Sequence, residues 1–126
     1  MSFIKVLIVD DSPTDLMILS ALLNHVGDYR VTQAADGFKA LDALGEGSPD
    51  ICLVDFDMPG MNGLEFVGKA RFEYPDLPFI IVSGVPAGDI VSAALAVGVQ
   101  TIISKANISS GVLDQEIKAA VAARVE

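Results

Sequence analysis

The sequence predicts an α/β protein built on a doubly wound, five-stranded parallel sheet. Short apolar runs alternate with helical patterns five times along the 126 residues. Each strand–helix–strand connection is short enough that only a right-handed crossover fits it. The run ICLV at 51–54 is apolar at consecutive positions, which is typical of a strand covered by helices on both faces. A parallel sheet flanked by helices is the simplest architecture for this pattern.

The first βα unit has the clearest signals. A strand is expected over 3–9, FIKVLIV, and a helix from residue 13 to about residue 25. Ser12 can cap this helix, Pro13 suits its first turn, and Asp15 has the spacing of a capping box with Ser12. The buried stripe of the helix is expected to be Leu16, Leu19, Leu23 and Val26.

The next two units follow the same logic. A strand over 29–34 leads to a short helix over 38–44, which the glycines at 45 and 47 are expected to stop. A third strand covers 51–54, and Asn62 can cap a helix that reaches about Phe72.

The last two units complete the sheet. A strand over 79–82 precedes a helix from about Ala87 to Val97, which Gly98 ends. The final strand is expected over 100–103, and Ser109 or Ser110 caps a last helix that runs to about Arg124. A chain of this length fits one domain, and we expect residues 1–126 to form it.

The composition excludes several classes of protein. Apolar residues make up 52% of the chain, which excludes a disordered segment, and no apolar run is long enough to span a membrane. The net charge of −9 argues against direct contact with a nucleic acid and favours a cation or a partner with a basic or apolar face. Cys52 is the single cysteine, which suits a cytoplasmic protein.

Polar side chains follow four of the predicted strands. Ligands of a doubly wound sheet bind beyond the carboxyl ends of its strands. The residues at that edge are Asp10 and Asp11 after the first strand, Asp55 and Asp57 after the third, Ser83 and Gly84 after the fourth, and Lys105 after the fifth. Crowded carboxylates repel one another unless a cation neutralises them, and Mg²⁺, with Mn²⁺ as the alternative, prefers such oxygen ligands.

The same edge carries the groups that phosphoryl chemistry needs. A carboxylate beside Mg²⁺ can act as a nucleophile toward phosphorus. The metal could bind one phosphoryl oxygen, Lys105 a second, and the Ser83 hydroxyl with the Gly84 backbone N–H a third. Each feature alone is commonly structural, because adjacent aspartates form turns and a lone lysine is usually solvated. Their joint occurrence at four strand ends favours the functional interpretation.

These residues lie in stretches that resemble the receiver domain of two-component response regulators. The stretches are VLIVDDSPTD, AADGFKAL, DICLVDFDMPGMNGLEF, FIIVSG and, more weakly, GVQTIISK. The D-x-x-M-P-x-M-N-G segment from Asp55 to Gly63 is highly specific in this context. The resemblance implies a flavodoxin-like (βα)5 fold with strand order 2-1-3-4-5.

The resemblance also implies a role for each site residue. Asp55 would accept a phosphoryl group from a phosphohistidine on a sensor histidine kinase or phosphotransfer protein. Asp11 and Asp55 would bind Mg²⁺ directly, Asp10 largely through water, and Asp57 through its backbone carbonyl. Ser83 and Lys105 would contact the phosphoryl group. The domain would catalyse only its own phosphorylation and slow dephosphorylation, so it would not be an enzyme with a separate substrate.

Several positions depart from the commonest pattern of that family, and two of them bear on the expected switch. Ala106 follows Lys105 where proline is usual, so we expect the loop there to differ. Ile102 stands where many members carry a switching aromatic side chain, so the aromatic readout of phosphorylation is not expected in its usual form.

Two apolar surfaces are candidates for partner contacts. Met17, Ile18 and Ala21 fall on the outer side of the first helix and suit a kinase or phosphotransfer helix, although scattered surface apolar residues are ordinary. Between residues 77 and 104 the only charged residue is Asp89. We therefore expect self-association or an output partner on the face of the fourth helix, fifth strand and fifth helix, through Val91, Ala94, Leu95 and Ile102.

Two other functions fit part of the pattern. Asp55-Phe56-Asp57 resembles the nucleophile motif of haloacid-dehalogenase-type phosphatases. That family carries further acidic metal ligands downstream of its lysine, whereas here only Asp114 and Glu116 follow Lys105 within a helical pattern. A carrier of flavin mononucleotide would need phosphate-binding donors in the first loop, where carboxylates repel phosphate. Both a free-standing regulator and the receiver part of a longer DNA-binding regulator stay open within the receiver interpretation.

Overall fold

The computed structural model describes residues 3–84, 88 and 90–124, and its five strands form one sheet. The strand order is β2-β1-β3-β4-β5, and every neighbouring pair is parallel. The strands are β1 (Ile4–Val9), β2 (Tyr29–Ala34), β3 (Ile51–Asp55), β4 (Phe79–Ser83) and β5 (Thr101–Ser104). The predicted doubly wound sheet and its strand order are confirmed.

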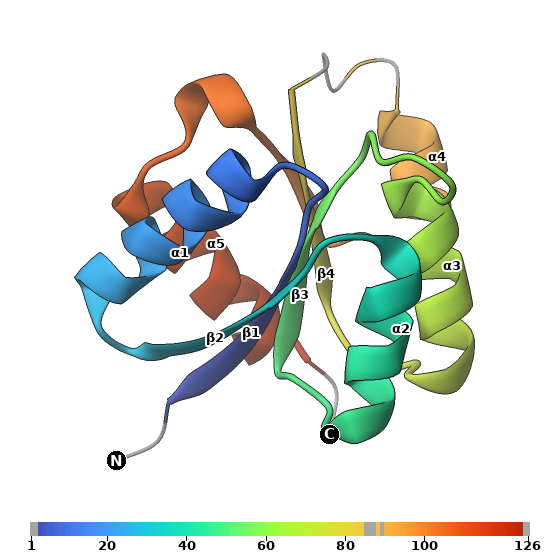
Figure 1. The fold of residues 1–126 in the computed structure, drawn as a ribbon, viewed down its shortest axis with the longest axis horizontal. Coiled ribbons are helices and arrows are strands. Elements are labelled where there is room, and N and C mark those ends of the chain that lie inside the picture. The colour runs from blue at the N-terminus through green and yellow to red at the C-terminus, as the bar shows by residue number, and fades with distance from the viewer. Residues whose placement is uncertain (1–2, 85–87, 89, 125–126) are drawn as a thin grey trace.

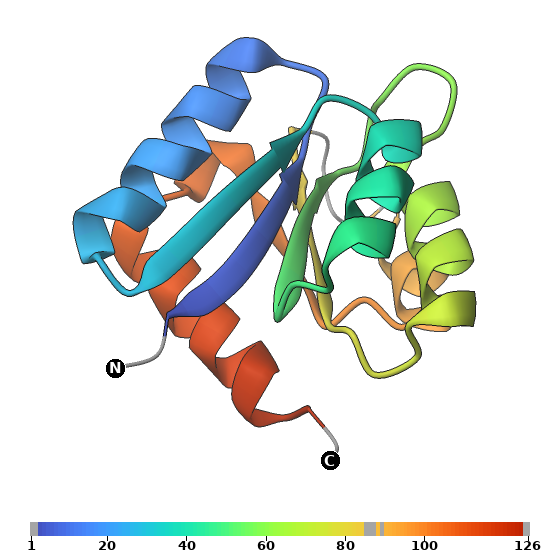
Figure 2. The same cartoon turned by 60° about the horizontal axis from the view of Figure 1, so that its bottom comes forward.

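Helices cover both faces of this sheet. They are α1 (Pro13–Val26), α2 (Gly37–Glu46), α3 (Gly63–Glu73), α4 (Val91–Ala96) and α5 (Ser110–Ala122), with a short 3-10 turn over Lys105–Asn107. In Figure 1, α1 and α5 lie on one face, and α2, α3 and α4 lie on the other. Figure 2 shows the same two layers from a second direction. None of the helices in the described residues is long and apolar enough to cross a membrane.

Side chains alternate along each strand between two hydrophobic cores. In β1, Val6 and Ile8 pack in the core under α1 and α5, while Leu7 and Val9 pack in the core under α2, α3 and α4. All five residues of β3 are buried because helices cover both of its faces. This explains the consecutive apolar residues of the third strand.

A side chain caps the N-terminus of each of the four longer helices, α1, α2, α3 and α5. Asn62 and Glu65 form a complete capping box at the start of α3. Ser109, rather than Ser110, caps α5 by accepting a hydrogen bond from the Val112 backbone N–H at 3.1 Å. The other caps are Ser12 at α1 and Asp36 at α2. These caps fix where the chain turns from each strand end into its helix.

Some helix boundaries differ from the sequence prediction. Gly45 lies inside α2, which ends at Glu46, and a helical glycine costs only about 1 kcal/mol relative to alanine. The fourth helix was expected from Ala87, but residues 85–87 and 89 lie outside the described residues. The described part of that helix, α4, runs over Val91–Ala96 and so ends one residue before the expected Val97.

Candidate functional site

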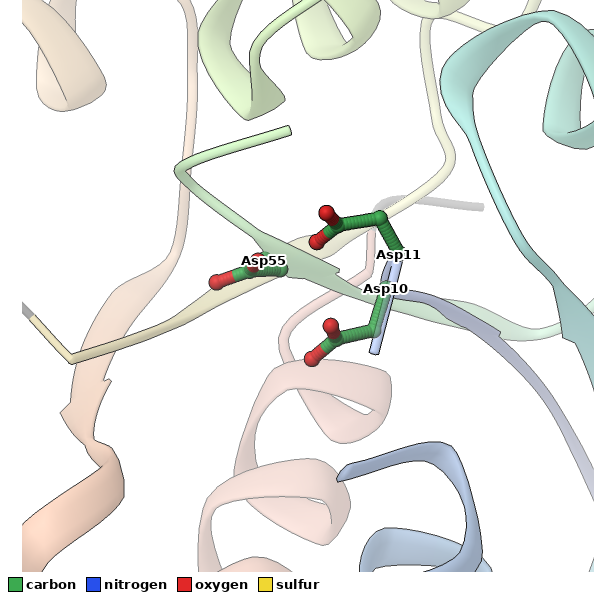
Figure 3. A group of neighbouring side chains, drawn as sticks. All are labelled: Asp10, Asp11 and Asp55. Atoms are coloured by element: carbon green, nitrogen blue, oxygen red, sulfur yellow. The ribbon is translucent and has the colours of Figure 1, made fainter. Parts of the chain in front are cut away.

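The carboxyl ends of β1 and β3 bring three aspartates together. Asp55 is the last residue of β3, and Asp10 and Asp11 follow β1, its direct neighbour in the sheet. One carboxylate oxygen from each side chain lies within 4.8 Å of the other two. Figure 3 shows the three side chains leaving the adjacent strand ends toward a common space. This confirms the predicted convergence of Asp10, Asp11 and Asp55.

Burial makes this group of carboxylates electrostatically costly. Asp10 and Asp55 are only 1% and 6% exposed, whereas Asp11 is exposed. Burial and the negative charge of Asp10 raise the pKa of Asp55 to about 6; Asp11 adds to this shift and Lys105 opposes it. A hard divalent cation would relieve the repulsion, and a set of carboxylate oxygens is the donor set that Mg²⁺ and Mn²⁺ take. The residues present therefore fit such an ion.

Lys105 supplies the positive charge at this edge. Its Nζ lies 3.0 Å from Asp10 Oδ2 and 3.2 Å from Asp55 Oδ1. Partial burial by itself would lower the pKa of the ammonium group. Hydrogen bonds to Asp15 and Asp10, with the charges of Asp10 and Asp55, outweigh that effect and raise the pKa above its ordinary value. The surrounding carboxylates therefore favour the charged form of Lys105 beside Asp55.

Asp15 is a site residue that the sequence prediction missed. Its Oδ2 lies 2.8 Å from Lys105 Nζ, closer than either of the other two carboxylates. Only half of the predicted capping box forms: the Asp15 backbone N–H donates to Ser12 Oγ at 3.2 Å, but the Ser12 backbone N–H donates to Asp10 Oδ1 at 2.9 Å instead of to the Asp15 side chain. A charged ammonium is a stronger partner for a carboxylate than a neutral backbone N–H. The only feature of the sequence that could have indicated this role is the position of Asp15 in the first turn of a helix that follows Asp10 and Asp11.

Gly63 fixes the loop that follows Asp55. Its backbone N–H donates to the Phe56 carbonyl at 2.7 Å. A Cβ atom at this position would collide with the backbone of Asp55 and Phe56. Met58 and Met61 are buried in the loop between them. The last glycine of the D-x-x-M-P-x-M-N-G segment thus allows the loop to close tightly on the strand end.

The remaining predicted site residues lie around this centre. Ser83 is buried at the end of β4, one residue beyond Val82, the partner of Asp55 in the sheet. Gly84 and the Asp57 side chain are exposed, and Asp57 is not in the aspartate group found among the described residues. Contacts of Ser83, Gly84 and the Asp57 carbonyl with a ligand stay predictions.

The two predicted partner surfaces differ in how well they are exposed. Met17 and Ile18 are 63% and 43% exposed on α1, and Ala21 is also exposed. On the other surface Val91 and Leu95 are exposed, and Ile102 is half-buried. Ala94 is completely buried in the core under α2, α3 and α4, so its prediction as a contact residue is wrong. One side of α4 must pack on the sheet, and Ala94 lies on that side.

A shallow cavity of about 200 Å³ lies away from this edge, between β1, β2 and the end of α2. A smaller one of about 160 Å³ adjoins the Lys105–Asp15 ion pair, and its lining residues are Asp15, Ile18, Leu19, Lys105 and Ile108. The smaller cavity therefore places Ile18, an exposed apolar side chain of α1, beside the charged site.

The chain is similar in sequence to known proteins. A family model described as the response regulator receiver domain matches residues 6–118. Protein-glutamate methylesterase/protein-glutamine glutaminase 2 of Syntrophus aciditrophicus is 39% identical over 134 residues, which cover 99% of this chain. The chain spans only 39% of the length of that relative. A chemotaxis protein CheY homolog of Campylobacter jejuni is 38% identical over 80% of each protein.

Solved structures agree with the sequence matches. Chemotaxis protein CheY4 of Vibrio cholerae superposes with a TM-score of 0.87 and 29% identity, over 94% of this chain and 99% of that one. The response regulator domain of Thermotoga maritima CheB gives a TM-score of 0.87 and 29% identity, over 98% of this chain and 99% of that one. Fold, site and sequence match agree, and the chain therefore belongs to the family of response regulator receiver domains, the signalling modules of two-component systems.

Proposed function

We propose that the chain is a phosphoacceptor in a two-component phosphorelay. Asp55 would take a phosphoryl group from a phosphohistidine on a sensor histidine kinase or a phosphotransfer protein. The observation that supports this most directly is the position of the Asp55 carboxylate, 3.2 Å from the Lys105 ammonium and within 4.8 Å of two further carboxylates. Phosphoryl transfer requires mainly this combination of a positioned nucleophile and compensating charge.

The proposed transfer assigns a step to each side chain. An Asp55 carboxylate oxygen bonds to phosphorus while the phosphorus–nitrogen bond breaks and its electron pair returns to the donor imidazole. Lys105 offsets charge on one phosphoryl oxygen, and the Ser83 hydroxyl with the Gly84 backbone N–H donates to another. In the slow dephosphorylation that ends the signal, water attacks phosphorus, the bond between phosphorus and the Asp55 oxygen breaks, inorganic phosphate leaves, and the Asp55 carboxylate is restored.

We propose Asp10, Asp11 and Asp55 as the residues that hold Mg²⁺, or Mn²⁺, with the Asp57 backbone carbonyl as a further ligand. When bound, the ion would neutralise charge on the phosphoryl oxygens. The burial of Asp10 and Asp55 supports this assignment, because two buried carboxylates and Lys105 leave an excess of negative charge at the site.

Phosphorylation is proposed to switch a protein partner. The exposed residues Met17, Ile18 and Ala21 of α1 would receive the kinase or phosphotransfer protein, since Ile18 lines the small cavity beside Asp15 and Lys105 and the other two are exposed on the same helix. Val91, Leu95 and Ile102 would contact an output partner or a second copy. We place this activity in the cytoplasm and propose residues 1–126 as one receiver domain, used either alone or joined to an output region as in its longer relatives.

The phosphoacceptor can be tested by intact-mass measurement after incubation with acetyl phosphate and Mg²⁺. We expect a gain of about 80 Da, the mass of one phosphoryl group, which disappears in Asp55→Asn. Asp57→Asn is the matched control, because it removes a neighbouring exposed carboxylate and keeps the backbone carbonyl. A gain that persists in Asp55→Asn would contradict the proposal, and so would steady turnover of a small aryl phosphate.

A further inference from the structure

The Lys105 ammonium group has a complete set of partners in the resting protein. An ammonium offers three N–H donors. Three carboxylate oxygens surround Nζ: Asp15 Oδ2 at 2.8 Å, Asp10 Oδ2 at 3.0 Å and Asp55 Oδ1 at 3.2 Å. A phosphoryl oxygen that approaches Lys105 must therefore compete with carboxylates that already hold it.

The three carboxylates differ in how easily they can release Lys105. Asp10 is buried and also accepts a hydrogen bond from the Ser12 backbone N–H. Asp55 is itself the proposed phosphoacceptor. Asp15 lies on α1, outside the aspartate group, and its side chain is 34% exposed. Water can replace Lys105 around Asp15 at little cost, whereas a buried carboxylate left unpaired is expensive.

Asp15 also stays available to pair with Lys105 when a cation is bound by the aspartate group. Asp10 and Asp55 share their charge with any cation held at the strand ends, but Asp15 does not belong to that set. The side chain of Asp15 thus draws Lys105 toward α1, on the wall of the small cavity lined by Ile18, Leu19 and Ile108.

We propose that Asp15 is a positioning residue that holds Lys105 in the resting state and competes with the phosphoryl group for it. This inference rests on the proposed phosphoacceptor function of Asp55. Its consequence is a weaker binding of the phosphoryl group than the site would have with Lys105 free, because part of the binding free energy is used to displace Asp15.

The test is a titration with beryllofluoride, a phosphoryl mimic, in the presence of Mg²⁺, followed by ¹⁹F NMR. Asp15→Asn should bind the mimic roughly threefold more tightly than the unaltered chain, the size expected for a partly exposed ion pair. Asp28→Asn is the matched control: it removes an exposed carboxylate that pairs with Lys118 at 3.0 Å, and the affinity should not change.

A double-mutant cycle separates the effect of Asp15 on Lys105 from a general effect of charge. In a Lys105→Ala background, Asp15→Asn should no longer tighten binding. Equal tightening in both backgrounds, or unchanged or weaker binding of Asp15→Asn alone, would overturn the inference while the proposed function stands. Failure of the unaltered chain to bind beryllofluoride, or binding that survives Asp55→Asn, would overturn the proposed function first and this inference with it.

Discussion

Gly63, the first residue of α3, packs directly on the backbone of Asp55, the last residue of β3. The contact leaves no space for a side chain, and the Gly63 N–H also closes the loop by donating to the Phe56 carbonyl. The direction in which the Asp55 carboxylate leaves the sheet therefore depends on a residue eight positions further along the chain.

Gly63→Ala should lower both stability and phosphorylation. The added methyl group must push the Asp55–Phe56 backbone aside, and such overpacking costs about 1–3 kcal/mol of unfolding free energy. Urea unfolding measures the first effect, and the rate of mass gain with acetyl phosphate measures the second. Gly68→Ala is the matched control in the same helix, because a Cβ atom there meets nothing within 4 Å; it should stabilise the protein by about 0.5–1 kcal/mol. Equal stability of the two variants would contradict the role of Gly63.

Asp55 should make the protein less stable as the pH rises from 4 to 6 without divalent cations. Its pKa is raised to about 6 in the folded protein by burial and Asp10, against an ordinary value of about 3.9. The folded state binds more protons than the unfolded state in this window, so the free energy of unfolding falls as the pH rises. Two pKa units correspond to at most about 3 kcal/mol.

Asp55→Asn checks this prediction because an amide does not ionise. At pH 7 in a chelator the variant should be more stable than the unaltered chain by about 2 kcal/mol, and most of that difference should vanish at pH 4. Urea unfolding of both proteins at the two pH values gives the comparison. A stability difference that does not change with pH would show that burial does not perturb the Asp55 carboxyl group.

Mg²⁺ should raise the melting temperature through the aspartate group. A ligand at ten times its Kd adds about 1.4 kcal/mol of unfolding free energy. Asp11→Asn should remove most of this response with little effect on the metal-free protein, because the Asp11 side chain is exposed. Thermal melts in increasing MgCl₂, with Asp42→Asn as a control that removes an exposed acid of α2, measure it. An undiminished Mg²⁺ response in Asp11→Asn would remove that residue from the ligand set.

Met17→Ala should slow phosphotransfer from a protein donor and leave phosphorylation by acetyl phosphate unchanged. Met17 is among the most exposed apolar side chains described, so its removal should change the free energy of unfolding by less than about 0.5 kcal/mol. Phe72→Ala is a matched control, since Phe72 is an exposed apolar residue of α3 on the other face of the sheet. The docking role is wrong if both variants slow transfer equally or neither does.

The sequence predicted the sheet well because strong local signals and the global fold agree. The apolar runs, the caps Ser12, Asn62 and Ser109, and the short connections all indicate the same architecture. The end of α2 was predicted too early because Gly45 is a weak stop signal, and the helix continues through it. Ala94 was assigned to a surface because a helix with small apolar residues on all sides gives no indication of which side packs on the sheet.

The candidate site shows the same division between local and long-range information. Asp10, Asp11, Asp55 and Lys105 could be predicted because the ends of parallel strands share one edge. The partner of Asp15 could not, because Asp15 and Lys105 are 90 residues apart and the nearby Ser12 offered an ordinary local explanation. A charge-assisted pair formed by tertiary structure took the Asp15 carboxylate away from the reciprocal bond of the capping box, while Ser12 still caps the helix.

Cys52 is the second residue of β3, the middle strand of the sheet, where it lies between β1 and β4 and is completely buried. Burial raises the pKa of its thiol, so the sulfur is both shielded and unreactive in the folded protein. A thiol reagent can modify it only when the middle of the sheet opens. The rate of alkylation at the only cysteine in the chain therefore reports how often the middle of the sheet opens, and Asp55 lies on the same strand as this cysteine.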